Sequence, residues 1–262
     1  MKKTISILLV AMLLVSVLSV FASAADGGKV RVTIYDGKEL VVTNWSVDIA
    51  GDGTDTIGSV LKGIHESMNK KFETATTEYG ESITCLWGIE NGGAYGYYVN
   101  DKMSSGLSDK LNNGDYLYAY VYSDAQYYTD TYSYFNLKTT TQKEGNTILL
   151  KLSHIGFDES WNPVVLPVEG ATITIDGVKT EYVTGSDGSV TVKVDKDCII
   201  SAVSDTLTLI PPFCAVSVLP GETIAPAPSG SSFPWAVVIV VCAVAIAAAV
   251  CVVIFVGKKK QK

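Results

Sequence analysis

The sequence contains few of the residues that build catalytic and metal sites. Its two histidines, His65 and His154, lie far apart and belong to no His/Cys cluster with the spacing of a zinc site. No Ser or Cys lies in a nucleophile motif such as G-x-S-x-G. Gly92-Gly93 precedes a predicted strand rather than a helix, which argues against a phosphate-binding loop. We therefore predict a protein that is not an enzyme and has neither a metal nor a cofactor.

Basic residues are also scarce between the two ends of the chain. The whole sequence has 20 Lys and Arg against 27 Asp and Glu, a net charge of −7. Six of the basic residues lie in residues 1–24 and 257–262, so the part between them has 14 basic and 27 acidic residues, a net charge of −13. A region this acidic binds nucleic acid and anionic lipid poorly, and its charge mainly favours solubility. We expect no nucleic-acid partner.

Cysteine is too rare for a disulfide framework. Of the five cysteines, Cys242 and Cys251 lie in the C-terminal apolar segment, and three remain elsewhere, an odd number. A Cys198–Cys214 bridge and buried free thiols are both compatible with the sequence.

Long hydrophobic runs occur only at the two ends. A basic start, an apolar run over 5–21 and the small residues Ala22-Ser23-Ala24 predict a secretory signal peptide over 1–24. The segment 235–256 has 22 residues without a charge and is followed by four lysines. A helix of that length spans a hydrocarbon core of about 30 Å, and lysines stay on the cytoplasmic side.

These two segments predict a single-pass cell-membrane protein of a bacterium of the Gram-positive type. Its N-terminal region is extracellular and its C-terminus cytoplasmic. A polar stretch near 139–146 separates two expected domains, and the Pro-, Ser- and Gly-rich text LPGETIAPAPSGSSF indicates a linker. The expected parts are a signal peptide (1–24), a first domain (27–138), a second domain (146–218), the linker (219–233), a transmembrane helix (234–256) and a basic tail (257–262).

The first domain has the pattern of two strands, a helix and further strands. The turn Asp36-Gly37 separates the first two strands, and Thr54-Asp55-Thr56 caps a helix whose apolar residues recur with a period near 3.6. This order predicts an α+β domain of β-grasp type. The expected strands are 29–35, 39–47, 83–89, 95–100 and 116–123.

The second domain has only short apolar runs separated by turns such as Asp176-Gly177 and Asp187-Gly188. This spacing favours a small all-β sandwich of immunoglobulin type. The predicted fold class is thus a β-grasp-like domain and an immunoglobulin-like sandwich with one C-terminal transmembrane helix. The expected strands are 147–152, 171–175, 189–194, 199–203 and 214–218.

One stretch of the first domain carries a family resemblance. Residues 89–124 read IENGGAYGYYVNDKMSSGLSDKLNNGDYLYAYVYSD. This text resembles the C-terminal domain of transcobalamin and intrinsic factor, and a related bacterial family of unknown function. The matching motifs are the turn 91–93, the strand 97–100, Gly106 and the turn 111–115. Asp101 stands where the family usually has Gly, and Tyr95 where it often has Trp.

The resemblance implies a non-enzymatic binding protein that captures a corrinoid or another small molecule. It also implies that a membrane transporter or a second surface protein receives the ligand or completes the site. By their match to the family, the ligand-binding residues are expected on the hairpin and the loop that follows. They are Tyr95, Tyr97, Tyr98, Met103, Ser104, Ser105, Gly106, Leu107, Ser108 and Asp109.

A tyrosine stripe supports an alternative function. Tyrosines at 116, 118, 120 and 122 alternate with small apolar residues, so they share one face of a strand. Rings with a hydroxyl suit carbohydrate, corrinoid or protein surfaces. The alternative is therefore a structural or adhesive surface protein that binds polymer or protein partners through this sheet face. Cross-strand aromatic pairing on an exposed sheet would also account for the stripe.

Overall fold

The computed structural model describes residues 27–219. They form 17 strands and one helix, and 52% of them are in strands against 6% in the helix. The predicted fold class, an α+β domain of β-grasp type followed by an immunoglobulin-like sandwich and a transmembrane helix, is therefore wrong for the described residues, which are mostly β. The prediction missed short or polar strands whose patterns carry little alternation, among them β3 (Glu73–Thr77), β6 (Lys102–Met103) and β9 (Thr139–Lys143).

Among residues 27–219, no helix is long and apolar enough to cross a membrane. The predicted signal peptide (1–24), membrane helix (234–256) and basic tail (257–262) lie outside the described residues. So does the predicted linker, except for Leu219, which is the last residue of a strand.

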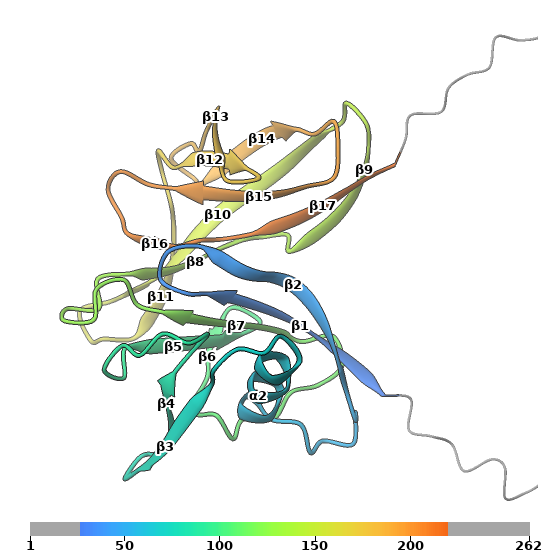
Figure 1. Cartoon of the computed structure of the whole chain (residues 1–262). Coiled ribbons are helices and arrows are strands. Elements are labelled where there is room, and N and C mark those ends of the chain that lie inside the picture. The colour runs from blue at the N-terminus through green and yellow to red at the C-terminus, as the bar shows by residue number, and fades with distance from the viewer. Residues whose placement is uncertain (1–26, 220–262) are drawn as a thin grey trace, which may run out of the picture. The chain divides into compact units, whose positions relative to one another are not determined.

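The first half of the described chain is a five-stranded sheet with α2 (Ile57–Ser67) packed on one face (Figure 1). Its strand order is β2-β1-β7-β5-β6, and β1 runs parallel to β7 while the other neighbours are antiparallel. Besides β6, its strands are β1 (Gly28–Tyr35), β2 (Leu40–Ile49), β5 (Tyr95–Val99) and β7 (Tyr116–Val121).

The helix begins where the sequence predicts. Thr56 is its N-cap, and Thr56 and Ser59 form a reciprocal capping box that satisfies two backbone donors. The apolar residues at helical spacing, Leu61 and Ile64 among them, are buried against the sheet. A hairpin of β3 and β4 (Gly80–Cys85) follows the helix. We call the residues buried between α2 and the five-stranded sheet, such as Val32, Ile34, Leu61 and Leu117, the helix-side core.

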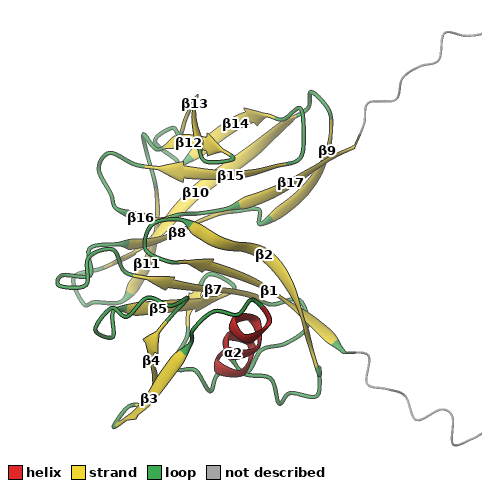
Figure 2. Cartoon of the chain, viewed as in Figure 1, coloured by secondary structure: helices red, strands yellow, loops and turns green. Residues whose placement is uncertain are grey.

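The second half consists of two sheets packed face to face around an aliphatic core (Figure 2). One sheet has the order β11-β10-β8-β16, with β14 also paired to β10. The other has the order β13-β12-β15-β17-β9. The strands of the first sheet are β8 (Thr131–Phe135), β10 (Thr147–Phe157), β11 (Pro163–Pro167), β14 (Ser189–Lys193) and β16 (Leu209–Ile210); those of the second, besides β9, are β12 (Thr172–Ile175), β13 (Val178–Val183), β15 (Cys198–Val203) and β17 (Cys214–Leu219).

Two strands near the expected domain boundary belong to the second half. β8, which precedes position 138, pairs with β10 and with β16, and β9 pairs in parallel with β17. Residues 27–219 belong to one compact unit. The two halves are therefore connected by packing as well as by the chain.

A cluster of tyrosines forms the packing between the halves. Tyr98, Tyr118 and Tyr120 lie on the sheet face opposite α2 and pack against Tyr132 of β8 and against Ile210 and Phe213. The rings of Tyr98 and Tyr132 are stacked, with centroids 3.8 Å apart. We call these six residues the tyrosine cluster. The predicted alternation is confirmed, because Leu117, Ala119 and Val121 lie in the helix-side core.

Gly96 makes room for this cluster. A Cβ at this position would lie 2.2 Å from Cζ of the Tyr120 ring, far inside contact distance. Only glycine lets the Tyr120 ring approach β5 this closely, so the sequence Tyr95-Gly96-Tyr97 is adapted to the aromatic packing beside it.

An ion pair joins the halves at the edge of the tyrosine cluster. Lys138 Nζ lies 2.6 Å from Asp101 Oδ1, and the Tyr132 hydroxyl donates to the same oxygen at 2.8 Å. The Lys138 side chain is 13% exposed, and burial lowers the pKa of its amine while Asp101 opposes that shift. The amine also lies 5.0 Å from the centre of the Tyr134 ring.

Candidate functional site

The structure separates the predicted hairpin tyrosines onto two faces of the sheet. Tyr95 and Tyr97 pack against the helix-side core, whereas Tyr98 is buried in the tyrosine cluster with 4% of its surface exposed. The Tyr95 hydroxyl lies 2.8 Å from the carbonyl of Thr84 and accepts from the amide of Asn91 at 2.7 Å. These side chains therefore make packing contacts and hydrogen bonds within the protein itself.

The predicted binding loop, residues 103–109, holds the first turn of α2. The carbonyl oxygens of Leu107 and Asp109 accept from the amides of Gly58 and Ile57, at 2.8 and 3.0 Å. Leu107 is buried in the helix-side core. Two backbone donors that a helix start leaves open are thus satisfied by this loop, which gives it a structural role.

Within that loop, Asp109 forms a tight turn. Its Oδ2 accepts from the amide of Ser105 at 2.7 Å. The pKa of Tyr97 is raised mainly by the burial of Tyr97 and further by the negative charge of Asp109. The Asp109 carboxylate is thus close enough to act on Tyr97, and whether the two share a ligand stays a prediction. Met103 is 59% exposed and Ser108 is also exposed, whereas Ser104 and Gly106 are half-buried.

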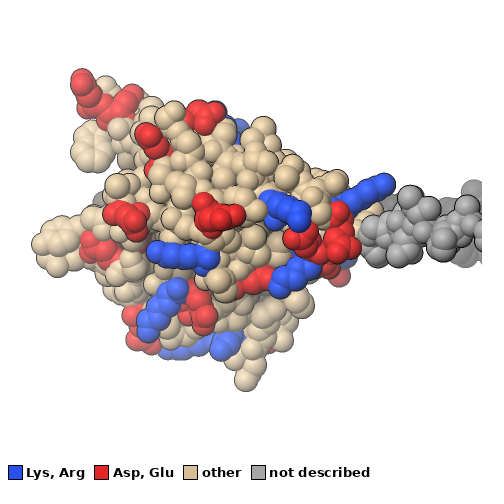
Figure 3. Space-filling view, turned by 90° about the horizontal axis from the view of Figure 1, so that it is seen from above, with Lys and Arg blue, Asp and Glu red and all other residues tan. Residues whose placement is uncertain are grey.

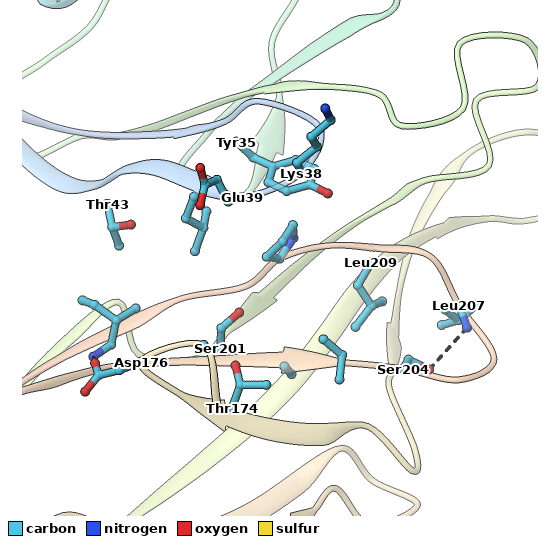
Figure 4. Close-up of a pocket in the computed structure, with 16 residues that line it drawn as sticks. Tyr35, Lys38, Glu39, Thr43, Thr174, Asp176, Ser201, Ser204, Leu207 and Leu209 are labelled. Carbon is cyan, nitrogen blue, oxygen red and sulfur yellow. Dashed lines mark hydrogen bonds between the residues drawn. The ribbon is translucent and has the colours of Figure 1, made fainter. Parts of the chain in front are cut away.

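A cleft elsewhere in the molecule has the shape of a binding site. It lies between the β1–β2 hairpin and strands β12 and β15, with a volume of about 610 Å³ (Figure 4). We call it the hairpin cleft. Figure 4 shows Tyr35, Lys38 and Glu39 on one side, and Thr174 and Ser201 on the strands opposite.

The lining of the hairpin cleft combines an apolar surface with a set of hydroxyl groups and a few charges. Burial, and then the carboxylates of Asp130 and Asp36, raise the pKa of Tyr35, so its hydroxyl stays a neutral donor. The apolar lining comes from Leu40, Ile199, Ala202, Val203, Leu207, Leu209 and Pro211. The polar lining comes from Tyr35, Thr43, Thr174, Ser201 and Ser204, with charges from Lys38, Glu39 and Asp176.

Tight turns fix both walls of the cleft. On the hairpin, Asp36 Oδ1 accepts from the amides of Lys38 and Glu39, each at 2.9 Å. On the opposite wall, Asp176 has φ +50° and its Oδ1 accepts from the amide of Ile199 at 2.9 Å. The Asp36 contacts form an Asx turn, which orders the hairpin without a core beneath it, whereas the Asp176 contact ties its turn to β15. The charged residues of the lining, Lys38, Glu39 and Asp176, therefore project from backbone segments that hydrogen bonds hold in place.

The inner wall is a strand that separates from its neighbour. β15 pairs with β12 as far as Val203, but its pairing with β17 among the described residues covers only Cys198–Ile200. Ser201 and Val203 both line the cleft, beyond the point where the β15–β17 pairing ends. The chain instead turns through 204–208 and returns as β16 beside β8.

Sequence reasoning did not find the hairpin cleft. It identified Asp36-Gly37 and Asp176-Gly177 as turns; the second turn lines the cleft, and the first lies between the lining residues Tyr35 and Lys38. The other lining residues come from strands far apart in the chain, and no motif connects them. The cysteine alternatives are resolved as well, because Cys85, Cys198 and Cys214 are buried free thiols, and burial raises the pKa of Cys214 to about 12.

No protein-family model matches this chain, and no curated protein matches it.

Proposed function

We propose that this chain is a non-enzymatic extracellular binding protein, held at the cell membrane by its C-terminal apolar segment. In this proposal the described part captures a small molecule in the hairpin cleft. The observation that carries it is the cleft itself, whose volume of about 610 Å³ lies within the range of about 300–1,000 Å³ typical of small-molecule sites. A transporter or second surface protein would then receive the ligand.

The chemistry of the lining favours a ligand with a flat apolar face and hydrogen-bonding edges. Leu40, Ile199 and Leu209 supply apolar contact, and hydroxyls such as those of Thr174 and Ser201 can pair with amide or hydroxyl groups. A corrinoid has this character, and it is the ligand that the resemblance to transcobalamin implies. The cleft would enclose one edge of so large a ligand.

Two observations favour the cleft over the predicted loop. The Tyr95 hydroxyl and the carbonyls of Leu107 and Asp109 already have partners inside the fold. A ligand that used them would have to compete with contacts inside the fold, which for Leu107 and Asp109 are those of the first turn of α2. The hairpin cleft can be occupied without such a loss.

The alternative of adhesion through a tyrosine face finds no support in this fold. Tyr118 and Tyr120 are 3% and 1% exposed, because the second half of the chain covers them. A polymer or protein could not reach that face while the two halves are packed.

The test is calorimetry of the full-length chain, in a mild detergent, with cyanocobalamin and with cobinamide. Ser201→Trp, which fills the cleft, should abolish saturable binding. Thr191→Trp, at an exposed position on β14, is the matched control and should leave it unchanged. Tyr97→Ala tests the predicted loop.

Three outcomes decide the proposal. Binding that Ser201→Trp removes and Tyr97→Ala spares supports the cleft. Binding that only Tyr97→Ala removes moves the site to the loop and rejects the cleft. No heat with either ligand up to millimolar concentration rejects the corrinoid.

A further inference from the structure

Three loops of the second half emerge at the same end of one sheet. β10 pairs antiparallel with β8, His154 opposite Ser133, and β16 pairs parallel with β8, Leu209 beside Thr131. The loop before β8 (124–130), the turn after β10 (158–162) and the loop before β16 (204–208) therefore lie side by side. Figure 1 shows them together at the left.

Exposed aromatic side chains lie on the loop before β8, at the end of β10 and on the turn that follows it. Tyr127 is 72% exposed, Tyr128 51%, Phe157 51% and Trp161 81%. The rings of Phe157 and Trp161 lie against each other, with centroids 6.2 Å apart. We call these four residues the aromatic tip. Large rings exposed as a group, rather than singly, mark an interaction surface.

The turns beneath the aromatic tip are held by aspartates. Asp158 Oδ1 accepts from the amides of Ser160 and Asn162, at 2.9 and 2.8 Å, and the amide of Trp161 donates to the carbonyl of Asp158 at 3.0 Å. In the other loop, Asp124 Oδ1 accepts from the amide of Tyr127 at 3.0 Å. The loops therefore present their rings at a low entropic cost of binding.

Two of the four aromatics have a strained backbone. Trp161 has φ +63° and Tyr128 has φ +55°, in the left-handed region that bulky residues rarely adopt. Asparagine or glycine would relieve that strain in each turn. The Tyr128 ring packs edge-on against Tyr122, with centroids 5.1 Å apart, whereas Trp161 contacts only Phe157 among the aromatic rings of the described residues, so a role in contact with a partner better explains Trp161.

The charge of the three loops indicates the partner. They contain no Lys or Arg, and their charged residues are all acidic: Asp124, Asp130, Asp158, Glu159 and Asp205. In Figure 3 the left-hand end of the molecule shows acidic and uncharged surface, and basic side chains begin further in. Ring faces and carboxylates both attract cations, so the surface complements positive charge.

We propose that the aromatic tip is a docking surface for a basic, Arg- or Lys-rich segment of another protein. Guanidinium groups stack on the rings of Trp161 and Tyr127, while Asp158 and Glu159 supply the opposing charge. None of the four aromatic residues lines the hairpin cleft, although Ser204 and Leu207 of the third loop do, and the contact stands whether or not the cleft binds a corrinoid.

The test is titration of an oligoarginine peptide against the full-length chain, with oligoglutamate of equal length as the charge control. Trp161→Ala should weaken oligoarginine binding about tenfold, as loss of a desolvated cation–π contact would. Trp161→Phe, which keeps an aromatic ring, should retain most of the affinity of the unsubstituted chain for oligoarginine. Trp45→Ala, a 53% exposed tryptophan on β2, is the matched control and should change affinity by less than about twofold.

The ionic contribution gives a second measurement. Affinity for oligoarginine should fall as salt rises, because exposed charges are screened. Equal binding of oligoglutamate, or an affinity that Trp161→Ala and Tyr127→Ala both leave unchanged, would overturn the proposal. Binding of a neutral oligosaccharide in place of oligoarginine would also overturn it and assign the surface to a glycan.

Discussion

The two faces of the first sheet are packed with opposite chemistry. Toward α2 the sheet presents aliphatic residues such as Val32, Ile34 and Leu117, which need only a complementary shape. Toward the second half the same strands present tyrosines, whose hydroxyls each require a partner. Tyr118 donates to the carbonyl of Pro211 at 2.7 Å, and Tyr120 to the hydroxyl of Tyr122 at 3.1 Å. The aliphatic face stabilises one half, and the tyrosine face also fixes how the other half is oriented on it.

One imidazole distinguishes the helix-side core. His65 Nδ1 lies 2.6 Å from the carbonyl of Leu61, and its Nε2 accepts from the amide of Trp87 at 3.1 Å. Both ring nitrogens are therefore satisfied when His65 is neutral, and burial lowers the pKa of His65. The two faces should respond to opposite ends of the pH scale.

The largest expected effect is a loss of stability at alkaline pH. Burial raises the pKa of Tyr98 to about 12 and also raises the pKa of Tyr118, Tyr120 and Tyr132. An unfolded tyrosine ionises near pH 10, so the stability is complete below about pH 10 and is lost above it. Each buried tyrosine should cost about 1.4 kcal/mol per pH unit there. Urea midpoints between about pH 9 and about pH 11 measure it.

A control separates the cluster from tyrosines in general. Tyr98→Phe should reduce the alkaline slope, and Tyr127→Phe, which removes a hydroxyl from an exposed ring, should not. An equal reduction of the slope by both variants would show that the buried hydroxyls of the tyrosine cluster do not cause the loss of stability at high pH.

The same tyrosines show how far the sequence predicts this structure. The alternation over 116–122 predicts correctly which residues face the helix, because side-chain direction on a strand is a local property. It does not predict that the tyrosine face is covered. That depends on Tyr132, Ile210 and Phe213, which come from distant segments whose short strands carry no clear period.

The candidate site was predictable to a smaller extent. The resemblance names the loop 103–109 as part of a binding site, yet the carbonyls of Leu107 and Asp109 accept from the amides of Gly58 and Ile57, a contact that no sequence pattern reveals. The hairpin cleft depends on β15 separating from β17 after Ile200. Strand separation follows from tertiary packing and leaves no motif in the sequence.

An intermediate effect is expected on the acid side and concerns the helix-side core. Because burial lowers the pKa of His65, the unfolded state binds a proton first, and stability falls as pH drops below about 6.5. The slope for one histidine is about 1.4 kcal/mol per pH unit. Burial also lowers the pKa of His154. Unfolding free energies between about pH 7 and about pH 5 measure the sum.

His154→Gln isolates the contribution of His65. The variant should retain about half of the slope of the unsubstituted chain between those pH values. A slope that disappears altogether in His154→Gln would contradict the assignment of acid sensitivity to the helix-side core.

The smallest effect, Tyr118→Phe, tests the hydroxyl pairing directly. The change keeps the ring in the tyrosine cluster and removes only the donor to the Pro211 carbonyl, in a side chain that is 3% exposed. Leaving that carbonyl without its donor should cost about 1–2 kcal/mol of unfolding free energy. Urea unfolding checks it, with Tyr127→Phe as the exposed control.

The result also bears on the cleft, because Pro211 lines it. A cost in the expected range means that the hydroxyl holds the segment before β17 in place, so ligand binding in the hairpin cleft should weaken in parallel. A cost near zero would mean that the Tyr118 hydroxyl adds nothing to the ring packing and the Lys138–Asp101 ion pair that hold the two halves together. The tyrosine face would then differ from the aliphatic face in shape but not in how it specifies orientation.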